Sequence, residues 1–236
     1  KLYLTNIIGS NFNNANLSFA HLYNVDIRGI DLYNINLHGI RLSGIYMENI
    51  DLSYVNLSHA NLIRVNFSGA NFKEVNLSNA NLSKANFSNT NFNNANLSNS
   101  NIYKTIFSYA DLSYAGFSCA NLEHACLAYA NLSYANFIDA DLNNANMWGA
   151  NFHKTCMVGA NLSHADLRDT KLLNTDLRWS NLSDANFSDA NIKNSNMRFA
   201  NLEYTKMENA SITDTKLDNA CMLHTNLKGA NISEID

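Results

Sequence analysis

The stretch NLSNANLSKANFSNTNFNNANLSN, residues 76–99, places Leu or Phe at every fifth position and fills most of the remaining positions with Asn, Ser and Ala. The same spacing runs from Leu2 to Ile232 and covers 47 positions, which hold only Leu, Phe, Ile or Met. Asn or Asp precedes the apolar residue in most repeats, and no insertion or deletion breaks the register. The whole chain therefore repeats one five-residue unit, whose apolar residue we call the centre.

A spacing of five residues predicts a chain that turns a corner in every repeat. A helix would place apolar residues about every 3.6 residues, and a strand about every 2. Four repeats instead close a square coil of 20 residues, with the centres inside and successive coils paired as parallel strands about 4.8 Å apart. Gly or Asn often occupies the second position after the centre, and both tolerate the positive φ of a type II turn. The sequence predicts an all-β parallel solenoid of about 12 coils, forming a rod about 55 Å long.

The repeat A-[DN]-[LF]-x-x resembles that of the pentapeptide-repeat family, and the resemblance extends over all 47 centres. It implies a right-handed quadrilateral β-helix, a handedness that is also general for parallel crossover connections. We interpret residues 1–236 as a single pentapeptide-repeat solenoid. Because the sequence begins at Lys1, we expect this solenoid to be a segment of a longer protein.

Composition limits the functions to consider. The formal net charge of −4 is too small to favour nucleic acid as a partner. No run of 18 apolar residues is present, so we expect no transmembrane helix. The sequence contains 12 Asn-Leu/Phe/Ile-Ser sequons, and sugars at these positions would disrupt the coil. We therefore expect a cytoplasmic protein, or one delivered into a host cytoplasm if it belongs to an effector.

Residues 20 apart should stack on neighbouring coils. One such column contains Arg64, Lys84, Lys104 and His124. Like charges stacked at this spacing repel one another unless something compensates them. The column is therefore a candidate stripe for an anion or an acidic partner. The alternative is a solvated edge whose long side chains splay apart.

A second candidate site combines Arg178 and Trp179 with Arg198 and Phe199, one coil further along. Because the centres fill the interior, both aromatic side chains should point outward. Exposed Trp and Arg are the residue types that dominate binding energy at protein interfaces. We interpret the four residues as a candidate partner-binding site. The alternative is an aromatic stack covered by its own arginines through cation–π contacts.

No catalytic or cofactor-binding pattern accompanies these surfaces. The sequence contains no nucleophile elbow, phosphate loop or HExxH motif. The predicted neighbours His164 and Asp184 lie on a convex column, whereas a metal site needs three or four converging ligands. A filled solenoid should also offer no cavity, and small-molecule sites are concave. We expect no cofactor, no metal and no enzymatic activity.

The sequence thus favours a non-enzymatic scaffold that presents an elongated polar surface to protein partners. One alternative is a targeting or substrate-docking module of a bacterial effector or multidomain signalling protein. A second follows from the family resemblance, because some members resemble B-form DNA and protect DNA gyrase from inhibitors. The unpaired strand edges at the two ends of a solenoid also predict end-to-end self-association.

Overall fold

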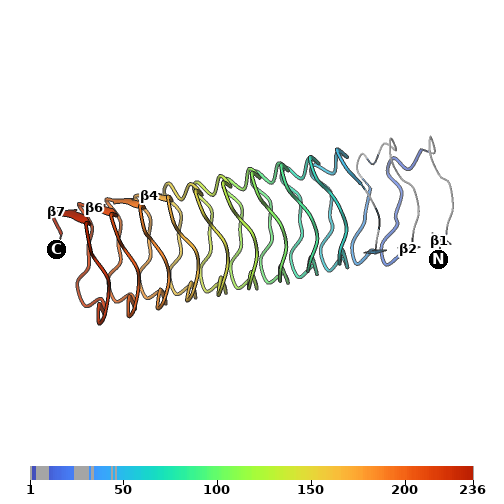
Figure 1. The fold of residues 1–236 in the computed structure, drawn as a ribbon. Helices are drawn as coiled ribbons and strands as arrows, with labels where there is room; N and C mark the ends of the chain where they lie inside the picture. Colours follow the sequence, from blue (N-terminus) through green and yellow to red (C-terminus); the bar gives the residue numbers. More distant parts are fainter. Residues whose placement is uncertain are drawn as a thin grey trace.

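The computed structural model describes residues 2–3, 11–23, 32, 35–43, 45 and 47–235, which form a rod of stacked coils with the chain termini at opposite ends (Figure 1). None of the described residues lies in an α-helix. In that part of the chain, accordingly, no helix has the length and apolar character needed to cross a membrane.

Short parallel strands mark both ends of the rod. The first sheet contains β1 (Leu2–Tyr3), β2 (His21–Tyr23) and β3 (Arg41–Ser43). The second contains β4 (Lys171–Leu173), β5 (Asn191–Lys193), β6 (Ser211–Thr213) and β7 (Asn231–Ser233). Single-residue parallel bridges continue the ladders between them, and each described pair joins residues 20 apart. This register confirms the predicted coil of four repeats, while the count of about 12 coils stays a prediction.

The repeat at residues 96–100 shows where each of its five main-chain N–H groups goes. Three of them donate to carbonyl oxygens of the coils before and after, at 2.7–2.9 Å. The N–H of Ser100 closes the corner by donating to the carbonyl of Leu97, at 3.3 Å. The last donor, the N–H of Ser98, bonds to Oδ1 of Asn96 at 3.0 Å. Asn or Asp precedes the centre because it supplies the acceptor that the backbone lacks at this point.

Removing one such acceptor should weaken the fold measurably. Asn136 Oδ1 accepts the N–H of Ile138 at 3.0 Å, and its ladder neighbours are the uncharged Gly116 and Cys156. We expect Asn136→Ala to lower the free energy of unfolding by about 1 kcal/mol. Asn136→Asp retains the acceptor oxygen, so it should lower the free energy of unfolding clearly less than Asn136→Ala does. Urea unfolding of both variants measures the difference, and equal losses would show that the acceptor is not what the repeat requires.

Every described corner uses a left-handed backbone conformation. The second residue after each centre has φ between 51° and 73°, which confirms the predicted corner geometry. The side chains that adopt it include ones as large as Lys84, Tyr109 and Trp179. Glycine has an additional role at Gly149, where a Cβ atom would lie 2.7 Å from the ring of Tyr129. The hydrogen bonds around each corner therefore hold residues that would ordinarily avoid this conformation.

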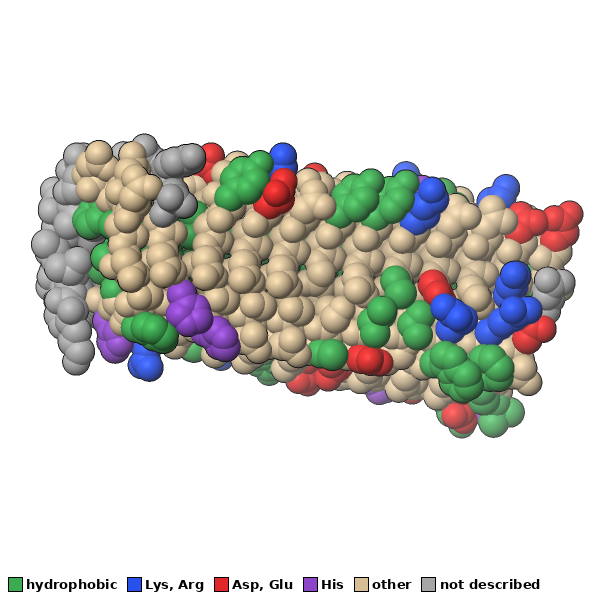
Figure 2. Space-filling model, turned by 180° about the vertical axis from the view of Figure 1, so that it is seen from behind, with side chains coloured by type: hydrophobic (Ala, Val, Ile, Leu, Met, Phe, Trp, Pro, Cys, Tyr) green, Lys and Arg blue, Asp and Glu red, His purple; other side chains and the backbone are tan. Residues whose placement is uncertain are grey.

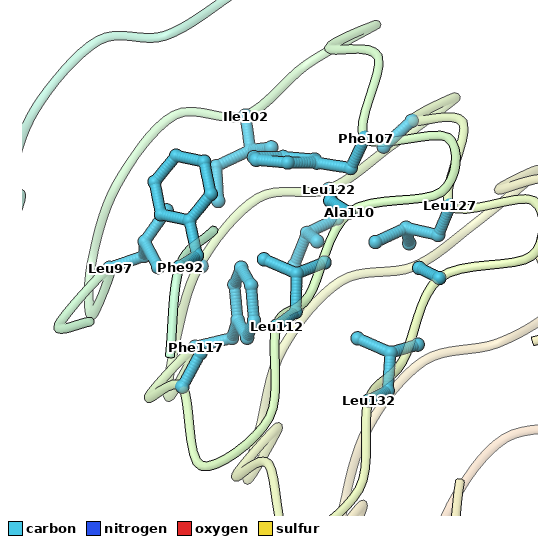
Figure 3. Close-up of a cluster of buried hydrophobic side chains, with 14 of the residues drawn as sticks. Phe92, Leu97, Ile102, Phe107, Ala110, Leu112, Phe117, Leu122, Leu127 and Leu132 are labelled. Atoms are coloured by element: carbon cyan, nitrogen blue, oxygen red, sulfur yellow. The ribbon is translucent and has the colours of Figure 1, made fainter. Parts of the chain in front are cut away.

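The centres form a continuous core along the rod. From Leu57 to Leu202 each centre has 0% of its surface exposed. Figure 3 shows the side chains of Leu97 and Phe107 directed into the interior of the coil. Because a coil is only four repeats around, its core is one layer of four centres, and each layer packs on the next.

Aromatic rings follow the coil spacing inside the core. Phe92 stacks on Phe72 with ring centroids 4.8 Å apart and planes inclined by 10°. Phe137 stacks on Phe117 in the same way, at 4.5 Å and 2°. These separations match the distance between neighbouring parallel strands, about 4.8 Å. The strand spacing therefore sets the ring spacing, and the buried rings lie in ordered columns.

Candidate functional site

Arg178, Trp179, Arg198 and Phe199, which we call the Trp179 corner, lie together on neighbouring coils. The N–H of Trp179 donates to the carbonyl of Arg198 at 3.2 Å. The Trp179 and Phe199 rings are parallel, with centroids 4.1 Å apart and planes inclined by 3°. Their residues are 60% and 41% exposed. The corner thus displays a preformed aromatic stack on the outside of a rigid coil.

The two arginines of the Trp179 corner bind carboxylates. Arg178 donates two hydrogen bonds to Asp176. One runs from Nε to Oδ1 at 2.9 Å, and the other runs from Nη2 to Oδ2 at 2.7 Å. These hydrogen bonds raise the pKa of Arg178 above its ordinary value. Arg198 donates from Nε to Asp218, and this bond holds the pKa of Asp218 below its usual range. Neither guanidinium makes a cation–π contact among the described residues. The Trp179 and Phe199 rings therefore stack on each other with no arginine over them.

Trp148 provides an internal comparison. Its indole N–H donates to Asp169 Oδ2 at 2.6 Å, and the guanidinium of Arg168 lies 5.8 Å from its ring centroid. Among the described residues, the indole N–H of Trp179 has no acceptor. Trp148 thus donates its indole N–H within the protein, whereas Trp179 has an exposed ring and an indole N–H with no acceptor among the described residues.

The surroundings of the Trp179 corner are partly apolar. Ile138 and Val158 occupy the position of Arg178 on the two preceding coils, and Ile138 is 37% exposed. On the face drawn in Figure 2, hydrophobic side chains lie next to Lys or Arg and Asp or Glu side chains toward the C-terminal end of the rod. A mixture of aromatic, aliphatic and paired charged groups is typical of protein interfaces.

Arg64, Lys84, Lys104 and His124, which we call the cationic column, occupy the same corner on four successive coils. Lys104 Nζ lies 5.1 Å from the ring centroid of Tyr103. His124 Nε2 lies 3.5 Å from a carboxylate oxygen of Glu123. Among the described residues, no carboxylate lies within ion-pair distance of Arg64 or Lys84. Lys104 and His124 therefore each have an aromatic or acidic neighbour, whereas Arg64 and Lys84 have no carboxylate near them among the described residues.

The described residues include a His–Asp pair and free cysteines outside the two candidate surfaces. His164 Nδ1 and Asp184 Oδ2 are 3.9 Å apart, as expected for neighbours in a column. No group of three potential metal ligands converges in the described part of the chain. All four cysteines are free thiols. The two candidate surfaces present aromatic rings, hydrogen-bonding groups and charged side chains.

One expectation from the sequence is wrong, because the surface does contain a hollow of about 350 Å³. It lies near the N-terminal end and is lined by Phe19, His21, Gly39, Arg41, His59 and Asn61. Phe19, Gly39 and His59 occupy one corner on three successive coils. Because Gly39 has no side chain, the Phe19 ring packs over it, with two ring carbons 2.6 Å from where a Cβ atom would lie. The signal in the sequence was a glycine between two large residues of one column.

Comparisons with known proteins support the architecture. The pentapeptide-repeat family model matches the chain in overlapping segments that together cover nearly all of it: residues 1–39, 30–69, 70–108, 91–128, 130–169, 160–198 and 195–233. No curated protein sequence matches the chain significantly.

The solved structures that are similar in fold include HetL and QnrB1. HetL, a pentapeptide-repeat protein involved in heterocyst differentiation regulation from the cyanobacterium Nostoc sp. strain PCC 7120, is 23% identical, with a TM-score of 0.56 over 98% of this chain and 90% of that one. QnrB1, a plasmid-mediated fluoroquinolone resistance protein, is 18% identical, with a TM-score of 0.51 over 81% of this chain and 92% of that one. The chain belongs to the pentapeptide-repeat family and folds, as the resemblance implied, into a right-handed quadrilateral β-helix.

Proposed function

We propose that this protein is a non-enzymatic scaffold that presents an elongated surface to protein partners, and that the Trp179 corner is its docking site. The observation that carries the proposal is the exposed stack of Trp179 on Phe199, with an indole N–H that the described residues leave unused. Large aromatic side chains supply most of the binding energy at many interfaces.

The rigidity of the coil favours binding at this corner. The main chain under Trp179 is bonded to the next coil, and the two rings already pack against each other. A partner would therefore not have to order these side chains, which ordinarily costs about 0.5–1.5 kcal/mol for each flexible group. The pairs Arg178–Asp176 and Arg198–Asp218 flank the rings and provide a charged rim.

Site-specific photo-crosslinking in the cells that make the protein tests the proposal. A photoreactive phenylalanine analogue would replace Trp179 or Phe199, and Tyr114 would serve as the control because it is also an exposed, stacked corner aromatic. We expect a discrete adduct from positions 179 and 199 and none from position 114. Equal crosslinking at all three positions, or none at 179 and 199, would contradict docking at the Trp179 corner.

The charge of the chain argues against the alternative in which the rod imitates DNA and binds gyrase. A rod about 55 Å long that imitated DNA would need about 30 negative charges, because duplex DNA carries one per about 1.7 Å. The chain has 20 acidic residues in all and a net charge of −4. Several of those acids are neutralised by arginine, including Asp166, Asp176 and Asp218. Imitation of DNA by charge is therefore disfavoured, and a gyrase subunit in the adduct would reverse this conclusion.

The scaffold proposal is compatible with a role as the docking module of an effector or signalling protein, since both need a surface that binds one partner. The partner's identity distinguishes them. An adduct with a host protein supports the effector form, and an adduct with a protein of the same cell supports an internal scaffold.

A further inference from the structure

The first three residues of the cationic column, Arg64, Lys84 and Lys104, form a row of permanent positive charges along one edge of the rod. All three are exposed. The main-chain N–H of each donates to a carbonyl oxygen of the next coil, at 2.9–3.1 Å. Because neighbouring parallel strands lie about 4.8 Å apart, the row extends over about 9.6 Å of backbone from Arg64 to Lys104. The ladder therefore fixes the spacing of the three charges.

Acidic residues do not neutralise this row. Residues 52–110 are all described and include one acid, Glu74, whose carboxylate lies 3.8 Å from Lys73 Nζ. Before this segment, Glu48 accepts a hydrogen bond from Asn66 at 2.7 Å. Among the described residues, no carboxylate lies within ion-pair distance of any of the three cations. The edge is thus positive without any contribution from histidine.

The fold itself gives no reason for three cations at this corner. Each has a φ between 55° and 61°, a conformation that glycine and asparagine adopt more readily than long side chains do. Asparagine holds the same position of the repeat at Asn79, Asn89 and Asn99, on the two neighbouring corners. Like charges one coil apart also repel each other. A solvated edge would be served equally well by asparagine, and such departures from a local rule are expected mainly at functional sites.

A second departure from the repeat lies beside Lys104. Ile106 occupies the position before the centre, where most repeats have Asn or Asp, and no other Ile, Leu, Val or Met occupies this position in the sequence. Its side chain cannot accept the N–H of Ser108, which has no acceptor among the described residues. Ile106 is also 42% exposed. The fold forgoes a hydrogen bond here for an exposed apolar side chain next to the row of cations.

We propose that the cationic column, together with Ile106, binds an acidic amphipathic helix of a protein partner, at a surface separate from the Trp179 corner. An α-helix rises 1.5 Å per residue, so carboxylates at positions i, i+3 and i+7 span about 10.5 Å. This length matches the row of about 9.6 Å, whereas three alternate residues of an extended strand would span about 13 Å. A Leu or Ile beside the acidic row of the helix can pack on Ile106.

Other polyanions fit this edge less well. Single-stranded nucleic acid binds through bases that stack on aromatic rings as well as through its phosphates. Tyr103, beside Lys104, is only partly exposed, and its ring centroid already lies 5.1 Å from Lys104 Nζ and 5.8 Å from the ring centroid of His124. Recognition of anionic lipid surfaces commonly uses clusters of about 4–8 Lys or Arg. The row has three.

Fluorescence anisotropy with the purified protein and labelled, stapled helical peptides tests the proposal. The probe peptide has Glu at i, i+3 and i+7 on one face and Leu beside that row. The control peptide has the same composition, with its Glu residues distributed around the helix. We expect the probe to bind with a dissociation constant on the order of 100 μM or tighter and the control to bind at least about fivefold more weakly. Added salt should weaken binding of the probe, because it screens surface charges.

Matched variants locate the binding surface. Lys84→Asn and Lys154→Asn each remove one positive charge from a left-handed corner and introduce a residue that is common there, but Lys154 lies outside the column. We expect Lys84→Asn to weaken binding of the probe about tenfold and Lys154→Asn less than about threefold. Ile106→Asn should weaken binding several-fold without lowering the melting temperature, because Asn restores an acceptor for the N–H of Ser108. Circular dichroism verifies that each variant is folded.

Any of five results would overturn the proposal. They are no binding of the probe at about 1 mM, equal binding of the control peptide, equal losses in Lys84→Asn and Lys154→Asn, a lower melting temperature but unchanged binding in Ile106→Asn, or tighter binding of oligothymidylate or phosphatidylserine vesicles than of the probe. Photo-crosslinking from position 179 does not involve this edge, so the two proposals stand or fall separately.

Discussion

Leu97→Asp is expected to lower the melting temperature of the rod by at least about 10 °C, which corresponds to several kcal/mol for a chain of this length. Leu97 is fully buried in mid-rod, where Figure 3 shows it beside Phe92 and among other apolar centres. A carboxylate there would have neither water nor a cation to stabilise its charge. Because each coil of a solenoid contacts only its neighbours, one weakened layer also uncouples the two halves of the rod.

Thermal unfolding followed by circular dichroism measures this loss, and Asn99→Asp is the control. Asn99 lies two residues further along, at an exposed corner with a φ of 57° that aspartate tolerates. The control should melt within a few degrees of the wild type. If Leu97→Asp melted at the wild-type temperature, the core assignment would be wrong.

The same variant should show a pH dependence of definite sign. Burial raises the pKa of a carboxyl group, so the folded variant holds a proton that the unfolded chain releases above about pH 4. Its stability deficit relative to the wild type should therefore grow as the pH rises above about 4 and shrink as the new carboxyl becomes neutral in both states. A deficit that did not change with pH would indicate that the side chain reaches solvent.

Phe92→Ala is expected to lower the free energy of unfolding by about 3–5 kcal/mol, because it opens a cavity in the aromatic part of the core. The Phe92 ring stacks on Phe72 at 4.8 Å and meets the edges of Phe87 and Phe107 at 5.1 and 5.4 Å. These neighbours are held by the ladder on either side and cannot collapse into the space.

Denaturant unfolding should show a lower midpoint for Phe92→Ala. Phe92→Leu is the matched control, since Leu is the commonest centre in this chain, and it should cost less than about 1.5 kcal/mol. Equal destabilisation by Ala and Leu would mean that ring packing contributes nothing beyond the presence of an apolar side chain.

The sequence by itself determined the coil, the core and the order of residues along each column. A period of five without insertions makes the structure nearly one-dimensional, so the neighbours of Leu97 or Lys84 follow from counting. The hydrogen bonds confirm this: the N–H of Lys84 bonds to Tyr103 in the next coil, and the N–H of Leu97 bonds to Gly116. The outward direction of Trp179 could be predicted for the same reason, because only the centres and the small residues before them fit inside.

Only the tertiary structure decided how side chains of adjacent columns pair and where the surface is hollow. Arg178 could have covered the Trp179 ring but binds Asp176, whereas Arg168 both binds Asp166 and covers Trp148. The surface hollow lined by Phe19, Gly39 and Arg41 likewise depends on how the Phe19 ring folds over Gly39. Register fixes where each Cα lies, but a long side chain reaches several neighbours whose contacts differ little in free energy. The choice among them depends on rotamers and local packing, which sequence spacing does not specify.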